Sequence, residues 1–157
     1  MSAFVAIVMG SPADLPHAEA IAAATSSYGI EVQMRIGSAH RTPEHVLKLL
    51  RDLDADPRPK VFITVAGRSN ALSGFTDPQV LAPVIACPPP GDTEDLWSSL
   101  SMPPGVASAV VREPVNAAMF AAKVLAPHDE KIAAAVQAAQ QRQRDRVYAA
   151  DEELLHR

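Results

Sequence analysis

Five short, largely apolar runs, separated by stretches of helical character, set the strongest limit on how this chain can fold. They span residues 4–9, 31–36, 61–65, 83–86 and 107–111. A short apolar run is typical of a strand that is buried on both faces, as in a parallel sheet covered by helices. The pattern predicts an α/β protein, a three-layer sandwich around a mostly parallel, doubly wound sheet of the flavodoxin-like or Rossmann-like type.

The segments between these runs carry helix signals. Residues 18–28 are rich in alanine and stop at Gly29, and apolar residues between positions 46 and 53 recur with helical spacing. We expect Asp92 to cap a short helix that runs to Leu100, and Pro114 to open another that runs to about residue 126. Residues 1–128 are therefore expected to form one α/β domain.

The C-terminal segment, residues 129–157, has a different composition. It is rich in Ala, Gln, Glu and Arg, and a thin apolar stripe runs along it, made by Ile132, Val136, Ala139, Val147 and Leu154. A helix of this length extends past a compact domain and needs a partner surface to cover its stripe. We predict that it packs on neighbouring subunits as part of the same single domain, and a solvated tail fits the pattern equally well.

Composition excludes several classes of partner. The chain has 157 residues, a net charge of −4 and no basic tract, which argues against a nucleic-acid partner. No apolar run approaches the roughly 20 residues of a membrane span. The N-terminus lacks the pattern of a secretory signal, and the single cysteine agrees with a reducing compartment, so we expect a cytoplasmic protein. No zinc motif is recognisable, so no metal site is predicted.

One short segment concentrates reactive side chains. Gly37 to Pro43 lies between the run at 31–36 and the next helix, and contains Ser38, His40 and Arg41. Arg41 just before a helix N-terminus suits an anion, and His40 suits proton transfer near neutral pH. By itself the segment is equally compatible with a bland interpretation, in which Ser38 and Thr42 only cap the turn, His40 is a satisfied surface histidine and Arg41 is solvated.

Other loops extend this candidate site. In open parallel sheets, ligands bind at the carboxyl ends of the strands, where the loops 10–14, 37–41, 66–70 and 87–92 should meet. The polar groups that these loops offer include hydroxyls, two arginines, an imidazole, an amide and a carboxylate, from Ser11, Asp14, Ser38, His40, Arg41, Arg68, Ser69 and Asn70. That set suits a small phosphorylated sugar–base compound. Neither a dinucleotide fingerprint nor a P-loop lysine pattern is present, so dinucleotide or ATP chemistry is disfavoured.

A few residues have simpler interpretations. Cys87 ends an apolar run and is expected in the core, and Trp97 is expected to pack its helix rather than to stack on a base. Asp14 fits a helix cap about as well as a ligand contact. The residues Pro88 to Pro90 are expected to form a stiff loop wall. The remaining histidines lie on or near helices and are expected at the surface; they are His17, His45, His128 and His156.

Several of these motifs, in this order, resemble the phosphoribosylaminoimidazole carboxylase (PurE) family of purine biosynthesis. The matching segments are Met-Gly-Ser at 9–11 with Asp14, Ser-Ala-His-Arg-Thr-Pro at 38–43, Ala-Gly-Arg-Ser-Asn-Ala-Leu-Ser-Gly at 66–74, and Met102-Pro103 with Gly105. The resemblance runs from about residue 4 to residue 129. The loop at 67–70, the Cys-Pro-Pro at 87–89 and the Trp-Ser-Ser-Leu at 97–100 resemble the class II branch.

The resemblance implies a reaction and a set of roles. Class II members add carbon dioxide to 5-aminoimidazole ribonucleotide, reversibly and without ATP, biotin or metal, so no cofactor is expected. His40 matches the family's proton-transfer residue. Ser11, Ser38 and Arg41 match phosphate positions, Asp14 matches the ribose position, and Gly67, Arg68 and Ser69 match the loop around the carbon dioxide and the base. The family also implies a homo-octamer whose C-terminal helices reach across subunits.

Four positions depart from the family pattern. Ala13 stands where serine is usual, Ser101 where class II has arginine, Pro104 where serine or glycine is usual, and Gly91 where serine is common. The favoured function is an aminoimidazole ribonucleotide carboxylase that uses carbon dioxide. Two alternatives remain: a mutase that moves a carboxylate from the N-carboxy nucleotide, and a catalytically weak nucleotide-binding oligomer.

Overall fold

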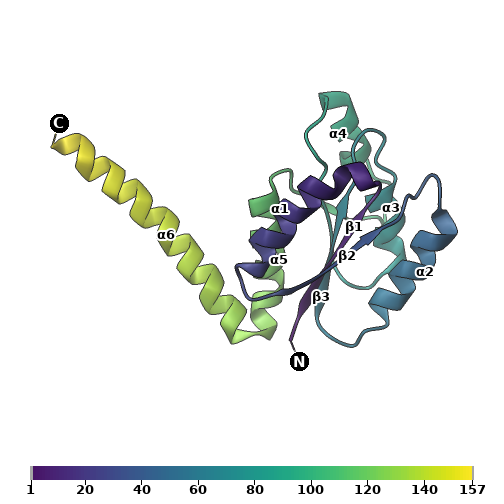
Figure 1. Cartoon of the computed structure of the whole chain (residues 1–157), viewed down its shortest axis with the longest axis horizontal. Helices are drawn as coiled ribbons and strands as arrows, with labels where there is room; N and C mark the ends of the chain where they lie inside the picture. Colours follow the sequence, from purple (N-terminus) through teal and green to yellow (C-terminus); the bar gives the residue numbers. More distant parts are fainter. Residues whose placement is uncertain (1, 157) are drawn as a thin grey trace.

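The computed structural model, which describes residues 2–156, contains a single parallel sheet with helices on both faces (Figure 1). The strand order is β2-β1-β3-β4-β5, the flavodoxin-like order, so the predicted fold class is confirmed. Every neighbouring pair of strands is parallel. The strands are β1 (Phe4–Met9), β2 (Glu31–Ile36), β3 (Lys60–Val65), β4 (Val84–Ala86) and β5 (Ala109–Val110).

The fifth strand is shorter than the sequence predicts. The apolar run covers residues 107–111, but β5 contains only Ala109 and Val110. Its single partner is β4, which has three residues, and the two strands pair only at Ile85 with Ala109 and at Ala86 with Val110. An edge strand cannot continue a ladder beyond the strand that it pairs with, so the run leaves the sheet on either side of these two residues.

The helices form the outer layers of the sandwich. They are α1 (Leu15–Ser26), α2 (Pro43–Asp54), α3 (Leu72–Thr76), α4 (Thr93–Leu100), α5 (Pro114–Leu125) and α6 (Glu130–Leu155), with short 3-10 turns η1 (Pro12–Asp14), η2 (Asp77–Gln79) and η3 (Ala126–His128). The first helix starts at Leu15, after Asp14 at its N-cap position and with Pro16 in its first turn. The chain leaves it through Gly29, whose φ of +74° favours glycine.

The sequence predicts Asp92 as a helix cap and leaves Asp14 open between a cap and a ligand contact. Asp14 and Asp92 do occupy the N-cap positions of α1 and α4, but neither side chain accepts a capping hydrogen bond. Asp129 does cap, since its carboxylate accepts from the backbone N–H groups of Lys131 and Ile132 at the start of α6. The carboxylates of Asp14 and Asp92 are therefore available to whatever lies at that edge of the sheet.

The core lies on both faces of the sheet, as the alternation of side chains along β1 illustrates. Val5, Ile7 and Met9 pack in one cluster with α1, α5 and the first half of α6. Phe4 and Val8 pack in the other cluster with α2 and the start of α3. Because successive side chains of a strand point to opposite faces, each face buries a continuous apolar layer. The two layers fix the strands, and with them the loops that follow the strands.

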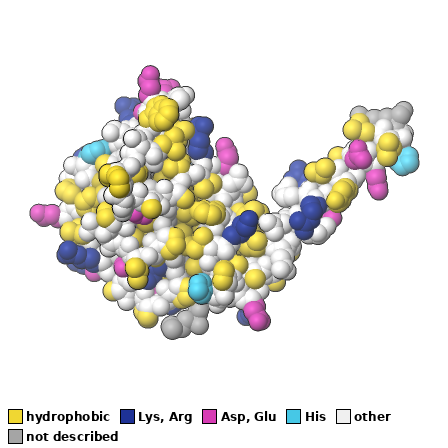
Figure 2. All heavy atoms as spheres, turned by 180° about the vertical axis from the view of Figure 1, so that it is seen from behind, with side chains coloured by type: hydrophobic (Ala, Val, Ile, Leu, Met, Phe, Trp, Pro, Cys, Tyr) yellow, Lys and Arg dark blue, Asp and Glu magenta, His cyan; other side chains and the backbone are white. Residues whose placement is uncertain are grey.

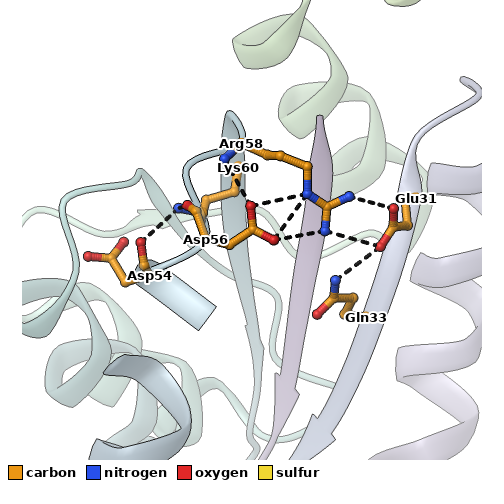
Figure 3. Close-up of polar contacts among 6 residues, drawn as sticks. All are labelled: Glu31, Gln33, Asp54, Asp56, Arg58 and Lys60. Carbon is orange, nitrogen blue, oxygen red and sulfur yellow. Dashed lines mark hydrogen bonds and ion pairs between the residues drawn. The ribbon is translucent and has the colours of Figure 1, made fainter. Parts of the chain in front are cut away.

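The amino edge of the sheet carries an interlocked set of charges (Figure 3). The Arg58 guanidinium contacts Glu31 at 2.6 Å and Asp56 at 2.9 Å, and lies 4.6 Å from the centre of the Phe4 ring. The Lys60 ammonium donates to the backbone carbonyls of Asp54 and Asp56. These contacts join the starts of β1, β2 and β3, and the charged groups there have partners within the protein.

The last helix, α6, projects away from the sandwich (Figures 1 and 2). Its first half rests on the domain, where Ile132, Val136 and Ala139 are buried. Its outer half is exposed, and Val147 and Leu154 of the predicted apolar stripe are 69% and 64% exposed. No helix in residues 2–156 is both long enough and apolar enough to span a membrane.

Candidate active site

A cavity of about 1130 Å³ opens at the carboxyl edge of the sheet. The loops that follow β1, β2, β3 and β4 all contribute to its lining, as the rule for open parallel sheets predicts. It brings together all the site residues proposed from the sequence except Asn70, namely Ser11, Asp14, Ser38, His40, Arg41, Gly67, Arg68 and Ser69. Residues from separate parts of the chain thus share one concave surface.

The loop after β1 presents a hydroxyl and a carboxylate. The Ser11 hydroxyl accepts from the Ala13 backbone N–H at 3.0 Å and so caps the short turn η1. This turn places the Asp14 carboxyl in the cavity lining, where partial burial raises its pKa, opposed by a backbone hydrogen bond from Ser11 and by the charges of His17 and Arg41. A half-buried carboxylate of this kind can accept hydrogen bonds from ribose hydroxyls.

The loop after β2 is a tight turn closed by its own hydroxyls. The Thr42 hydroxyl accepts from the Ser38 N–H at 3.1 Å and donates to the Ser38 carbonyl at 3.2 Å. The Ser38 hydroxyl accepts from the Arg41 N–H and from Arg41 Nε, at 3.2 and 3.3 Å. The bland interpretation of Ser38 and Thr42 is thus partly right, because both stabilise the turn. The same contacts also fix the direction of the Arg41 side chain.

Gly37 sets the position of this turn against α2. A Cβ atom at Gly37 would lie 2.8 Å from Cγ2 of Val46, which is fully buried. Only glycine lets the end of β2 approach α2 this closely, because a methyl group would overlap the valine. His40 and Arg41 follow within four residues, so their positions depend on this close approach.

The loop after β3 contributes a strained residue to the cavity. Arg68 has a φ of +53°, in the left-handed region that side-chain-bearing residues rarely adopt. Arg68 and Ser69 are exposed in the cavity lining, whereas Asn70 is 3% exposed and turns into the protein. The expectation that Asn70 faces the ligand was therefore wrong, because its amide is used in internal hydrogen bonds.

Cys87 and His17 contact each other outside the cavity lining. Cys87 is fully buried, as expected, and its burial raises the pKa of the thiol to about 12. Its sulfur is 3.5 Å from His17 Nε2, so His17 is not the plain surface residue that the sequence suggested. Burial lowers the pKa of His17, against opposing contributions from Cys87, Asp14 and Glu113. A thiol with so high a pKa is a poor nucleophile, which supports a packing role.

Some lining residues were not singled out from the sequence. Asp95 lines the cavity from the first turn of α4. Acidic residues are common in the first turn of any helix, so nothing in the sequence indicated that Asp95 belongs to the site. Pro89 and Pro90 line it too, in agreement with the expected stiff loop wall. Trp97 is 63% exposed, so its expected packing within this chain was wrong.

The positions that depart from the family pattern divide into two pairs. Ala13 and Gly91 line the cavity, whereas Ser101 and Pro104 lie outside its lining. A hydroxyl lost at position 13 or 91 can therefore affect a bound ligand directly. Within residues 2–156, no group of three or more His, Cys, Asp or Glu side chains is arranged to hold a metal ion.

Comparison with known proteins identifies the family. The sequence profile of AIR carboxylase matches residues 4–146. The chain belongs to the AIR carboxylase family. Phosphoribosylaminoimidazole carboxylase of Treponema denticola is 46% identical over 157 residues, covering 98% of this chain and 99% of that protein. The protein of the same name from Archaeoglobus fulgidus is 46% identical over 151 residues, covering 94% of this chain and 83% of that protein.

The fold agrees with the same family. The crystal structure of Treponema denticola PurE matches this chain with a TM-score of 0.95 at 46% identity, over 97% of this chain and 98% of that one. A match of this quality covers α6 as well as the sandwich, so the projecting helix belongs to the shared fold of this AIR carboxylase family member and its relative. The family suggested by the motifs of the sequence is confirmed.

Proposed function

We propose that this AIR carboxylase family member is a phosphoribosylaminoimidazole carboxylase of purine biosynthesis. It reversibly adds carbon dioxide to 5-aminoimidazole ribonucleotide to give the 4-carboxy nucleotide, without ATP. The observation that carries the proposal is the cavity in which the family motifs meet, in a chain 46% identical over nearly its full length to enzymes of that name. The class II assignment, with carbon dioxide as co-substrate, rests on the motif resemblance.

The chemistry places specific demands on the site. The ring carbon beside the amino group is enamine-like, and its electron pair forms the new bond to carbon dioxide. The adduct then carries both a hydrogen and a carboxylate on that carbon, and loss of the proton restores the aromatic ring. A base must take this proton, and in the reverse direction an acid must return it. We assign both roles to His40, which is exposed in the cavity.

Binding of the nucleotide follows from the charges around the cavity. Arg41, with Ser11 and Ser38, suits the phosphate, because charge-assisted hydrogen bonds to phosphate are strong and the turn fixes the arginine. Asp14 suits the ribose hydroxyls. Gly67, Arg68 and Ser69 suit the base and the new carboxylate, where backbone N–H groups and a guanidinium can stabilise developing negative charge.

Assembly and location follow the same proposal. A homo-octamer would cover the exposed apolar residues of α6 and the exposed Trp97 and Leu100 of α4, which are 63% and 48% exposed in the single chain. We assign the C-terminal segment, residues 129–157, to contacts with neighbouring subunits, beside a catalytic domain at 1–128; Met1 and Arg157 lie outside the described residues. A cytoplasmic location fits the small-molecule substrates, aminoimidazole ribonucleotide and carbon dioxide.

Ultraviolet absorbance on mixing the protein with the 4-carboxy nucleotide, without ATP, tests the proposal. Wild type should decarboxylate it, and His40→Asn should be slower by about 100-fold or more, because general acid–base catalysis contributes that much. His128→Asn is the matched control, since His128 is exposed at the opposite edge of the sheet, and it should keep wild-type activity.

Three other outcomes would change the proposal. Equal activity of wild type and His40→Asn would remove His40 from the mechanism. Conversion of the N-carboxy nucleotide, without conversion of aminoimidazole ribonucleotide and carbon dioxide, would identify the mutase instead. Tight nucleotide binding without any turnover would identify a binding protein.

A further inference from the structure

The strained conformation of Arg68 requires something to hold it. With a φ of +53°, Arg68 is the only non-glycine residue with a positive φ among residues 2–156. Strained residues persist only where the surroundings fix them, and they gather at functional sites. The residues next to Arg68 therefore show what holds this loop in place.

The Ser98 hydroxyl, from α4, holds the loop by its backbone. The Ser98 oxygen accepts from the Asn70 N–H at 2.8 Å, and the Ser98 O–H donates to the Arg68 carbonyl oxygen at 2.9 Å. The same hydroxyl lies 2.6 Å from the Asp95 carbonyl oxygen within α4, so one proton is shared between two acceptors. One side chain thus joins the peptide groups on both sides of Ser69 to α4.

The Asn70 side chain anchors the far end of the loop. Its amide oxygen accepts from the N–H groups of Leu72 and Ser73, at 3.0 and 3.3 Å. Its amide nitrogen donates to the hydroxyls of Ser73 and Ser99, at 3.1 and 2.9 Å. Asn70, Ser73 and Ser99 are all buried, with exposures of 3%, 0% and 1%. A buried polar network satisfied in this way is rigid and specifies one arrangement.

We propose that Ser98 and Asn70 are positioning residues for the candidate active site. They hold the loop 67–70 against α4, so that Arg68 stays in its left-handed conformation and faces the cavity with Ser69. The inference rests on the proposed function in one respect, the assignment of Arg68 and Ser69 to the base and the new carboxylate. Such a loop stabilises the transition state only if it is already in place when charge develops.

The kinetic consequence is specific. The groups assigned to phosphate and ribose lie on the loops after β1 and β2, and within residues 2–156 they make no hydrogen bond with Ser98. Loss of the Ser98 hydroxyl should therefore leave nucleotide affinity nearly intact. We expect Ser98→Ala to lower kcat by about 10-fold to 100-fold, the scale of a misplaced catalytic group, with KM changed less than about threefold.

Hydrogen exchange and steady-state kinetics on four full-length proteins test this. They are wild type, Ser98→Ala, Ser98→Thr, which keeps a hydroxyl, and Ser101→Ala, which removes an exposed hydroxyl just after the same helix. Ser98→Ala should speed exchange at the hydrogen-bonded amides of the loop, those of Asn70, Leu72 and Ser73, by at least about tenfold, while the β1 and β3 amides stay protected. Ser98→Thr should restore part of both the protection and kcat, and Ser101→Ala should match wild type.

The outcomes separate this inference from the proposed function. Unchanged exchange at the amides of Asn70, Leu72 and Ser73 in Ser98→Ala would overturn it, and so would faster exchange with an unchanged kcat. If wild type had no turnover at all, the proposed function would fail, and the exchange data alone would still decide whether Ser98 holds the loop. A fall in exchange protection across the whole sheet would also overturn it, because the hydroxyl would then be a general packing element.

Discussion

The two edges of the sheet use charged side chains in opposite ways. At the amino edge, Arg58 is held between Glu31 and Asp56, and its charge is satisfied within the fold (Figure 3). At the carboxyl edge, the side chains of His40 and Arg68 make no hydrogen bond within residues 2–156, and Arg41 contacts only the Ser38 hydroxyl through its guanidinium. None of the ion pairs described for these residues lies in the cavity.

The pKa values of the carboxyls follow the same division. Hydrogen bonds from Arg58 lower the pKa of both Glu31 and Asp56 at the amino edge. At the carboxyl edge, burial raises the pKa of Asp14, because the nearby positive charges do not offset the loss of water. Charges that neutralise each other stabilise the fold, and charges without a protein partner are left for a ligand.

Replacing Arg41 by alanine should have the largest effect on ligand binding. Hydrogen bonds to charged groups contribute about 1.5–3 kcal/mol, so KM for the nucleotide should rise about 10-fold to 100-fold in steady-state assays. Arg58→Ala, assayed in parallel near neutral pH, should keep the wild-type KM. An equal rise in KM for both variants would mean that the two edges do not differ in function.

Gly37→Ala tests how the fold places the turn with His40 and Arg41. The added methyl would lie 2.8 Å from Val46 Cγ2, and overpacking of this kind costs about 1–3 kcal/mol, measured as the free energy of urea unfolding. The double variant Gly37→Ala, Val46→Ala should cost less than the sum of the two single changes, because shortening Val46 removes the overlap. Additive costs would place the strain elsewhere.

Arg58→Ala should have the smallest effect, and it should depend on pH. Glu31 and Asp56 have lower pKa values folded than unfolded, so their pairing stabilises the fold above their ordinary pKa values of 4.5 and 3.8. That stability is lost as the pH falls through the lowered folded values. The Tm of the variant should lie below that of wild type at neutral pH, and the gap should narrow in strong acid to what the Phe4 contact contributes.

Lys48→Ala is the control for this last prediction. Lys48 pairs with Asp52 along α2, but the two side chains are 76% and 60% exposed. Exposed pairs of this kind contribute little to stability. Its Tm should follow wild type at every pH, and a gap like that of Arg58→Ala would show that any surface charge change produces the effect.

The sequence was sufficient wherever the determining signal is local. The apolar runs located all five strands, and the rule that ligands bind after parallel strands gathered Ser11, His40 and Arg68 at one cavity. The length of β5 was missed because it is set by its partner β4 rather than by its own residues. Side-chain direction decides capping, which is why Asp92 occupies its predicted N-cap position without the expected hydrogen bond.

Contacts between distant segments were not predictable in this way. Ser98 meets Arg68 and Asn70 across 30 and 28 positions, and Arg58 meets Glu31 across 27. No periodicity or turn signal links residues so far apart, because their meeting depends on the packing of whole helices and strands. Trp97 shows the same limit, since its helical spacing suggested packing that a single chain does not provide.

The fully buried Cys87 makes this protein its own reporter of opening. It is the single cysteine of the chain, and burial raises its pKa to about 12, so a thiol reagent reaches neither an exposed sulfur nor a thiolate in the folded state. The rate of labelling therefore acts as a clock for opening of the sandwich around β4. Fraying of the exposed outer half of α6 does not expose Cys87. The labelling rate therefore reports opening of the α/β domain and not motion of the projecting helix.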